Sequence, residues 1–215
     1  LFIQKLLEDN RFIGDYLFTE VLEEQEPVLK NFMLRTSILR RMNAKLCNAL
    51  INEPESQIIL EKLQQSNFFL FALDDSNHWY RYHRLFADLL QNQLQQQYPQ
   101  EIPRLHHQAS QWLAKNNLFA EAMWHALEAK DYQQAVFIVQ NHAFDILEVG
   151  ELTTLKGWLD MLPQEWLVHE AWMSIIYAWV LAYTGQLNAV EKYLELANNA
   201  LQRDGQRASI ERNSI

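Results

Sequence analysis

The run from Asn67 to Leu90 constrains the fold most, because the spacing of its apolar residues changes within it. Two aromatic-rich segments, Phe68 to Phe71 and Trp79 to Tyr82, flank a polar stretch of Asp, Ser and Asn. This composition is typical of two strands joined by a tight turn. From His83 onward the apolar residues follow helical spacing. The sequence therefore predicts a strand, a turn, a second strand and a helix that begins at His83.

Helical patterns dominate the rest of the chain. The 215 residues include only five Gly and five Pro, and helix interiors exclude both residue types. Apolar periodicity predicts helices near residues 13–24, 27–37, 43–51, 56–66 and 83–97. Ser56 is the predicted N-cap of the fourth of these helices. The predicted fold class is therefore all-α, with one short β-hairpin.

The segment from Tyr98 to Pro103 marks the clearest boundary between two domains, because one of its two prolines stops a helix and the other starts the next. We place a domain junction there. The first domain is predicted to cover about residues 12–102, after a tail from an upstream domain at residues 1–11, and the second to cover residues 103–215. Because the chain opens without methionine and stops in a polar run, we expect it to be an excised piece whose second domain is incomplete.

From Arg104 onward the apolar stripes form a series of helix pairs separated by short polar turns. Stacked antiparallel pairs of this kind are the units of an α-solenoid. The last three predicted helices cover residues 152–162, 166–184 and 187–201. In the final pair Gly185 suits the turn, Ala178 is small and Leu181 is bulky. This pattern is similar to a tetratricopeptide repeat (TPR), although Val190 replaces the expected alanine.

Two strings carry a family resemblance: LRTSIL at residues 34–39 and WYRYHRLFADLL at residues 79–90. In this order they resemble the winged-helix segment of MalT-like regulators. These are large signal-transducing nucleotide-binding (STAND) proteins that often end in a LuxR-type DNA-binding domain. The resemblance extends from about Phe12 to Leu201. It implies a helical winged-helix module followed by an α-solenoid of TPR-like helix pairs.

The same resemblance implies a function in signal sensing and autoinhibition within an ATP-dependent transcription regulator. ATP exchange and inducer binding would release the winged helix, permit self-association and activate a distant DNA-binding domain. No Gly-rich phosphate loop of the Walker type occurs in this sequence. We therefore expect no cofactor in this chain, and ATP or ADP only in an upstream nucleotide-binding domain. Nor do we expect an enzyme, because the sequence contains no nucleophile motif.

His83 is the candidate site residue of the winged-helix module. In related nucleotide switches, a histidine at the base of this module contacts the phosphate of bound ADP, and the resemblance assigns that role to His83. Arg81 and Arg84 flank it, and an imidazolium at a helix start can donate to a phosphate oxygen. The alternatives are that His83 caps the helix or packs between domains.

Trp124 and Trp166 are the candidate ligand-binding residues of the arm. Six of the seven tryptophans lie in the second domain, and aromatic side chains in a concave superhelix can stack on sugars or apolar ligands. The alternative is that tryptophans at helical spacing fill the core, which we expect of Trp172 and Trp179. A rival function is a protein-interaction scaffold, in which the repeats bind a peptide or partner protein and no small-molecule inducer.

We do not expect this segment to bind nucleic acid directly, because the chain is acidic. Its formal net charge is −9, whereas phosphate backbones favour a basic face. Arg35, Arg40, Arg41 and Lys45 form the only local basic cluster in the sequence. We interpret this cluster as a solvated face or as a contact with the nucleotide-binding domain.

The remaining sequence features concern metal binding and location: we expect no metal site, and we expect a cytoplasmic protein. Glu121 and His125 lie four residues apart on a helix, but two ligands do not make a zinc site. The single Cys47 fits a reducing compartment, where it is expected to be a small buried residue. Neither a signal peptide nor an apolar run long enough to span a membrane is evident.

Overall fold

The computed structural model describes residues 22, 25–51, 55–66, 68–74, 78–148 and 150–213, without the side chains of His169 and residues 204–213. The predicted tail at residues 1–11, and nearly all of the predicted helix at residues 13–24, lie outside these residues. The chain divides into two units, Leu1–Leu113 and Ala114–Ile215. The division between the units lies about ten residues after the junction predicted at residues 98–103. The domain limits given above stay a prediction.

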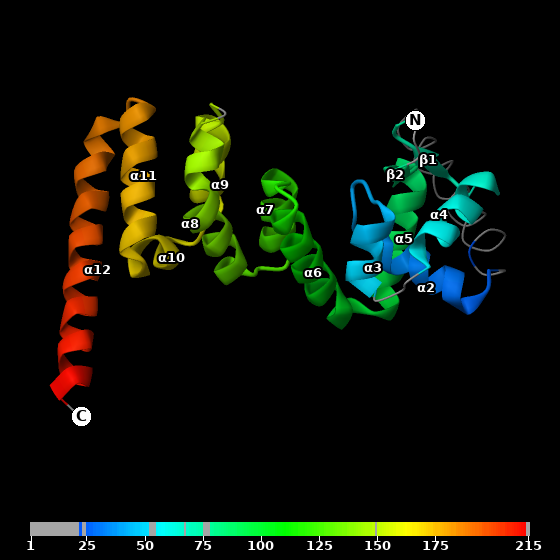
Figure 1. Ribbon diagram of the computed structural model, residues 1–215, viewed down its shortest axis with the longest axis horizontal. Helices are drawn as coiled ribbons and strands as arrows, with labels where there is room; N and C mark the ends of the chain where they lie inside the picture. Colours follow the sequence, from blue (N-terminus) through cyan, green and yellow to red (C-terminus); the bar gives the residue numbers. More distant parts are fainter. Residues whose placement is uncertain are drawn as a thin grey trace, which may run out of the picture. The chain divides into compact units, whose positions relative to one another are not determined.

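The first unit combines short helices with one hairpin, in the predicted order (Figure 1). Its elements are α2 (Pro27–Thr36), α3 (Ala44–Ile51), α4 (Ser56–Gln65), β1 (Leu70–Ala72), β2 (Tyr80–Tyr82), α5 (Arg84–Gln97), the 3-10 turn η2 (Pro99–Glu101) and α6 (Ile102–Lys115) without its last two residues. Pro27 occupies the first turn of α2, where its missing N–H has no helical partner to lose.

The hairpin is antiparallel, and its register separates a buried face from an exposed one. Leu70 pairs with Tyr82, and Phe71 pairs with Arg81. Leu70, Tyr80 and Tyr82 are buried, whereas Phe71 and Arg81 are exposed. The alternation follows from the period of two in a strand. The predicted first strand began too early, because Phe69 has a φ of 49°, which is not an extended conformation.

A buried hydrogen-bond pair joins the hairpin to helix α2. The Thr36 hydroxyl donates to the carbonyl of Phe32 at 2.8 Å, which commits its only proton. The Tyr82 hydroxyl must therefore be the donor in the 2.9 Å bond between Tyr82 Oη and Thr36 Oγ1. The Tyr82 ring also packs edge-on against Phe86 of α5, with ring centroids 5.8 Å apart. These contacts hold β2 against both helices.

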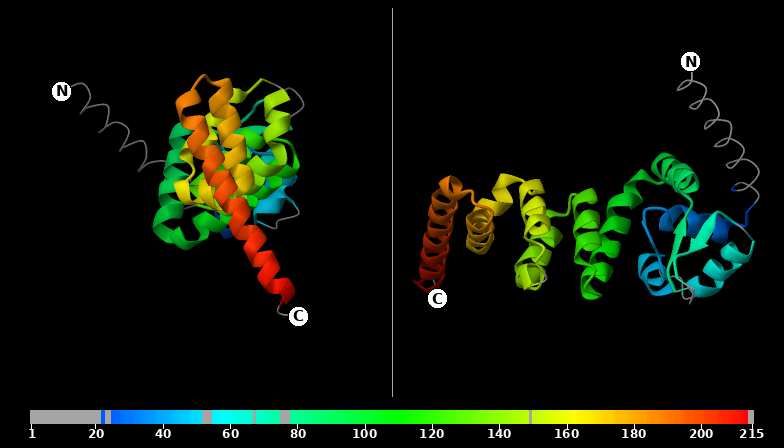
Figure 2. Two further views of the ribbon diagram at one scale, coloured as in Figure 1. Left: turned by 90° about the vertical axis from the view of Figure 1, so that its left-hand side faces the viewer. Right: turned by 90° about the horizontal axis from the view of Figure 1, so that it is seen from above.

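The second unit is built from successive helices that lie side by side (Figure 2). They are α7 (Phe119–Glu128), α8 (Tyr132–Glu148), α9 (Leu152–Met161), α10 (Gln164–His169), α11 (Ala171–Tyr183) and α12 (Leu187–Asn213). Gly185 has a φ of 76° in the turn between α11 and α12, as its predicted place at a turn requires. Ala178 and Leu181 are buried, while the likeness to a TPR stays a prediction.

Several predicted helix limits were wrong. The single helix predicted over residues 166–184 is divided into α10 and α11 at Glu170, which has an extended φ of −103° and ψ of 111°. The final helix continues to Asn213 rather than ending at Leu201. Ser56 is the first residue of α4, and Glu55 is its N-cap.

The all-α fold class is confirmed, since most of the described residues are helical and their one sheet has only two strands, beside an isolated bridge between Met42 and Tyr80. Across those same residues, no helix combines the length and the apolar character that crossing a bilayer would need.

Candidate functional site

His83 lies at the junction between β2 and α5, where it is the N-cap residue of α5. Its backbone N–H donates to the carbonyl of Phe69 at 2.7 Å, and its own carbonyl accepts from the N–H of Ala87 at 2.9 Å. The imidazole makes no capping hydrogen bond to the helix and is exposed. The backbone of His83 therefore starts the helix while its side chain faces solvent. The alternative that His83 caps the helix holds for its position as the N-cap residue, but its imidazole makes no capping bond.

The surroundings of His83 are both basic and aromatic. Its ring lies beside Phe71, with centroids 6.1 Å apart, and Phe71 is 49% exposed. Arg81 stands across the hairpin from Phe71, and Arg84 is the first residue of α5; both are exposed. Two guanidinium groups and an imidazole are thus exposed within four consecutive residues, and Arg81 and His83 both lie beside the Phe71 ring. This arrangement suits an anionic group presented by another domain or ligand.

The predicted basic cluster does not act as one group. Arg35 forms a bidentate pair with Glu101, at 2.9 and 3.0 Å, and its guanidinium lies 5.4 Å from the Tyr98 ring centroid. Hydrogen bonding to Arg35 lowers the pKa of the Glu101 carboxyl. Arg41 instead covers the Trp79 ring, 4.6 Å from its centroid. Arg35 is therefore committed to a structural ion pair, and Arg41 to an aromatic contact.

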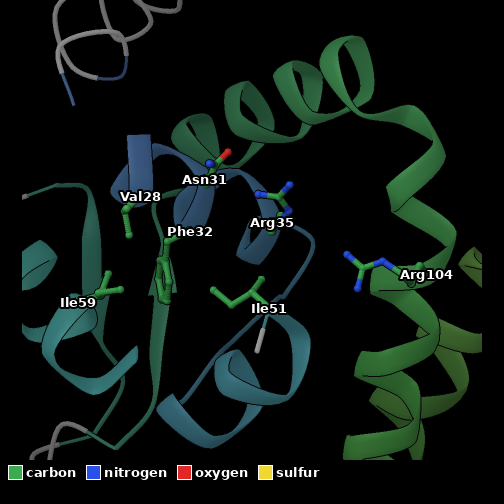
Figure 3. A pocket seen from close by; sticks show the side chains of 7 residues that line it. All are labelled: Val28, Asn31, Phe32, Arg35, Ile51, Ile59 and Arg104. Atoms are coloured by element: carbon green, nitrogen blue, oxygen red, sulfur yellow. The ribbon is translucent and has the colours of Figure 1, made fainter. Parts of the chain in front are cut away.

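A cavity of about 250 Å³ lies beside Arg35 in the first unit (Figure 3). It is lined by Val28, Asn31, Phe32, Arg35, Ile51, Ile59 and Arg104. Arg104 also contacts Glu101, at 3.3 Å, and bonds to Gln108 at 2.7 Å. The one carboxylate of Glu101 bonds to both guanidinium groups, so it neutralises only part of their positive charge.

The two candidate tryptophans of the arm are half-buried on separate helices. Trp124 of α7 packs edge-on against His125, with ring centroids 4.6 Å apart. Trp166 of α10 lies 6.2 Å from the Tyr132 ring. Each ring thus has its own aromatic neighbour. Their assignment to a ligand site stays a prediction.

The prediction that Trp172 and Trp179 fill the core was wrong. They are 41% and 45% exposed, and Phe144 of α8 is 49% exposed. Phe144 lies 6.1 Å from Trp172 and 5.8 Å from Trp179, between ring centroids. Tyr183 extends the group, 5.5 Å from Trp179. Sequence reasoning missed this exposed cluster, because the spacing of seven residues identifies one helix face but not whether that face is covered.

The polar groups that the sequence singled out do not assemble a metal centre. Among the described residues, no three His, Cys, Asp or Glu side chains lie close enough together to hold an ion. Cys47 is fully buried, as predicted, and burial raises the pKa of its thiol. His125 is buried as well.

The comparison with known families concerns the part of the chain that bears His83. Residues 18–102 match the family model described as the MalT winged helix domain. This segment of the chain is similar to the winged-helix domain of MalT. The resemblance inferred from the strings at residues 34–39 and 79–90 is thereby confirmed.

Similarity to MalT proteins continues beyond the winged helix. The chain is 35% identical over 191 residues to the HTH-type transcriptional regulator MalT of Yersinia pestis (strain Pestoides F), an alignment that covers 88% of this chain and 21% of that protein. The MalT regulator of Yersinia enterocolitica (serotype O:8 / biotype 1B) shows the same identity and coverage. The chain thus spans about a fifth of the length of the curated relatives that it matches.

Proposed function

We propose that this chain is the regulatory, signal-sensing segment of an ATP-dependent MalT-type transcriptional regulator. It would couple inducer binding and nucleotide state to a DNA-binding domain outside the chain. The names of the relatives describe HTH-type transcriptional regulators. The segment itself is neither an enzyme nor a DNA-binding domain in this proposal, and the protein acts in the cytoplasm.

The exposed imidazole of His83 is the observation that carries the proposal. It lies at the start of α5 without a capping bond, between two exposed arginines. A nucleotide-binding domain that packs against this side of the winged helix would bring an ADP phosphate to His83. The imidazolium would donate to a phosphate oxygen, and the basic surroundings would favour the anion. Loss of ADP would release the winged helix.

The test uses the full-length protein, because the nucleotide domain is needed. Its release of fluorescently labelled ADP is measured for His83→Ala and for the matched control His78→Ala, which changes an exposed histidine in the same hairpin region. A hydrogen bond to a charged group contributes about 1.5–3 kcal/mol. We therefore expect His83→Ala to weaken ADP binding roughly 10- to 100-fold, and His78→Ala to leave it within about twofold.

His83→Gln gives a further readout, because an amide can donate to phosphate without carrying charge. We expect it to restore part of the ADP affinity that alanine loses. Equal ADP affinity in the wild type and His83→Ala would refute the phosphate contact. So would an equal loss in His83→Ala and His78→Ala, since that result would indicate a general disturbance of the hairpin.

The helical arm is proposed to sense the inducer, with Trp124 and Trp166 as the residues to test. Both rings are partly exposed, and both have an aromatic neighbour that could complete a stacking surface. A thermal-shift scan against sugars and metabolites should find a ligand that raises the melting temperature by mass action. Loss of that shift in Trp124→Ala or Trp166→Ala would support the assignment, and its retention in both would contradict it.

A protein-interaction scaffold without a small-molecule ligand is the second candidate function. The observation that favours it is the exposed cluster of Phe144, Trp172 and Trp179, since aromatic side chains are enriched at protein interfaces. A scan in which no compound shifts the melting temperature, together with unchanged ADP binding in His83→Ala, would favour this candidate.

A further inference from the structure

The exposed faces of α8 and α11 together form an aromatic surface that has no assigned role. We define it by Phe137, Phe144, Trp172, Trp179 and Tyr183, which are 52%, 49%, 41%, 45% and 67% exposed. The two helices pack against each other, and ring contacts of 5.5–6.1 Å connect the last four residues. This set of residues is called the aromatic surface below.

The size of the aromatic surface matches the centre of a protein interface. An aromatic side chain offers about 150–250 Å², so five half-exposed rings leave about 500 Å² in contact with solvent. The largest apolar patch on a monomer is about 300–600 Å² and is often functional. A standard interface buries about 800 Å² on each partner. A small ligand would cover only part of this surface.

Helix α11 gives an independent reason to expect a covering partner. Its thirteen residues, Ala171–Tyr183, include no charged side chain. A helix that is apolar on all sides is normally buried on all sides. One face of α11 is buried through residues such as Met173 and Leu181, but Trp172 and Trp179 lie on a face that remains open.

The charges beside the aromatic surface restrict the chemistry of the partner. Asp145 and Glu148 are exposed on α8. Asp145 follows Phe144 directly and contacts His142 at 3.2 Å, and Glu148 lies about one turn beyond Phe144. Neither α8 nor α11 contains a lysine or arginine. A second copy would bring the same carboxylates together, which is unfavourable. A partner with basic residues beside its apolar residues would pair with them.

The spacing of the rings favours a helix as the partner element. Phe137 and Phe144 are seven residues apart, as are Trp172 and Trp179, which corresponds to two turns or about 10.5 Å along each axis. Residues on one face of a partner helix recur at the same interval. We propose that the aromatic surface binds an amphipathic α-helix of another protein whose apolar stripe is flanked by lysine or arginine. This proposal does not depend on the nucleotide role of His83.

The test measures binding of labelled 18-residue peptides to the chain by fluorescence anisotropy. One peptide is an amphipathic helix with a leucine stripe flanked by lysines, and the other has glutamate in place of each lysine. We expect the lysine peptide to bind at least about tenfold more tightly, since charge complementarity favours it. Raising the salt concentration should reduce this preference by screening.

Charge reversal tests where the peptide binds. Asp145→Lys with Glu148→Lys should weaken binding of the lysine peptide about tenfold and improve binding of the glutamate peptide, because each change replaces attraction by repulsion. Glu191→Lys with Glu195→Lys is the matched control, since these residues are exposed on α12 and change the net charge equally. Equal effects of the two double variants would overturn the proposal, because they would show attraction to the acidic chain as a whole.

A double variant, Phe144→Ser with Trp179→Ser, tests what the aromatic side chains contribute to peptide binding. The control is Ile58→Ser, which changes another exposed apolar side chain. We expect at least about tenfold weaker binding only in the first variant, whose fold is checked by circular dichroism. If it is misfolded, the charge-reversal pair, which changes only exposed side chains, decides the matter. Sedimentation without peptide gives the last outcome: a dimer that Trp179→Ser dissociates would assign the surface to a second copy and overturn the proposal.

Discussion

The buried hydroxyl pair of Thr36 and Tyr82 allows a quantitative prediction about how the hairpin is held. Thr36 is fully buried and Tyr82 is 5% exposed. Thr36→Val keeps the shape of the side chain but removes the acceptor of the 2.9 Å bond from Tyr82. The tyrosine hydroxyl would then be buried without that partner, which costs about 1–3 kcal/mol.

The reciprocal change is expected to cost less. In Tyr82→Phe the Thr36 hydroxyl still donates to the carbonyl of Phe32, so only the net value of one hydrogen bond is lost, about 0.5–1.5 kcal/mol. The double variant leaves no tyrosine hydroxyl to satisfy. Its cost should therefore be smaller than the sum of the single costs by about 1 kcal/mol, the coupling free energy of a contacting pair.

Guanidinium unfolding of the four proteins, followed by far-UV circular dichroism, measures this coupling. Because the chain has two units, the curves are fitted with two transitions, and only the one that belongs to the first unit should shift. Additive single costs would refute the reasoning, since they would show that the two hydroxyls do not interact in the folded state. A Thr36→Val protein as stable as the wild type would refute it as well.

Three further predictions concern pH and backbone conformation. The hydrogen bond from Arg35 lowers the pKa of the Glu101 carboxyl. The stability that Glu101→Gln removes should therefore be present at pH 7 and be lost as the pH falls through the folded-state pKa, which lies below the ordinary glutamate value of about 4.3. Unfolding curves across acidic pH measure this loss. Burial lowers the pKa of His106 to about 4, so NMR should show a neutral ring down to about pH 5. Between about pH 6.5 and pH 4 only the unfolded chain takes up a proton at this residue, so the stability of the folded state should decrease as the pH falls through that range. Gly185 has a φ of 76° and open space where an alanine methyl group would lie, so Gly185→Ala should destabilise the fold by about 1 kcal/mol through backbone strain alone. Gly157 lies inside helix α9, so Gly157→Ala should stabilise the fold by about 0.5–1 kcal/mol. Thermal melts of the two variants test both expectations.

The hairpin and the helix after it could be predicted because one segment carries both periodicities. Tyr80 and Tyr82 alternate with Arg81 as a strand requires, and Phe86 and Leu90 then follow at helical spacing. The division between α10 and α11 could not be predicted, because no glycine or proline marks it. It depends on tertiary contacts such as the 2.6 Å bond from the Ser174 hydroxyl to the carbonyl of Leu167.

The candidate site was predictable only where the backbone determines the direction of a side chain. His83 follows a strand whose inward residues are tyrosines, so its placement on the outer side followed from alternation. The exposure of Trp172 and Trp179 did not follow from their spacing, because α11 is apolar on every side. Their contact with Phe144 joins two helices that are distant in sequence, which single-helix periodicity does not reveal.

The buried and exposed faces of the hairpin have to be considered together. Tyr82 points inward because its hydroxyl reaches Thr36 and its ring packs on Phe86. The next residue, His83, is thereby directed outward, and its backbone bond to Phe69 holds it at the helix start. A substitution that loosens Tyr82 would leave the imidazole chemically unchanged but less well positioned. Under the proposed function, stability of the hairpin and affinity for ADP are therefore linked through neighbouring residues that face opposite ways.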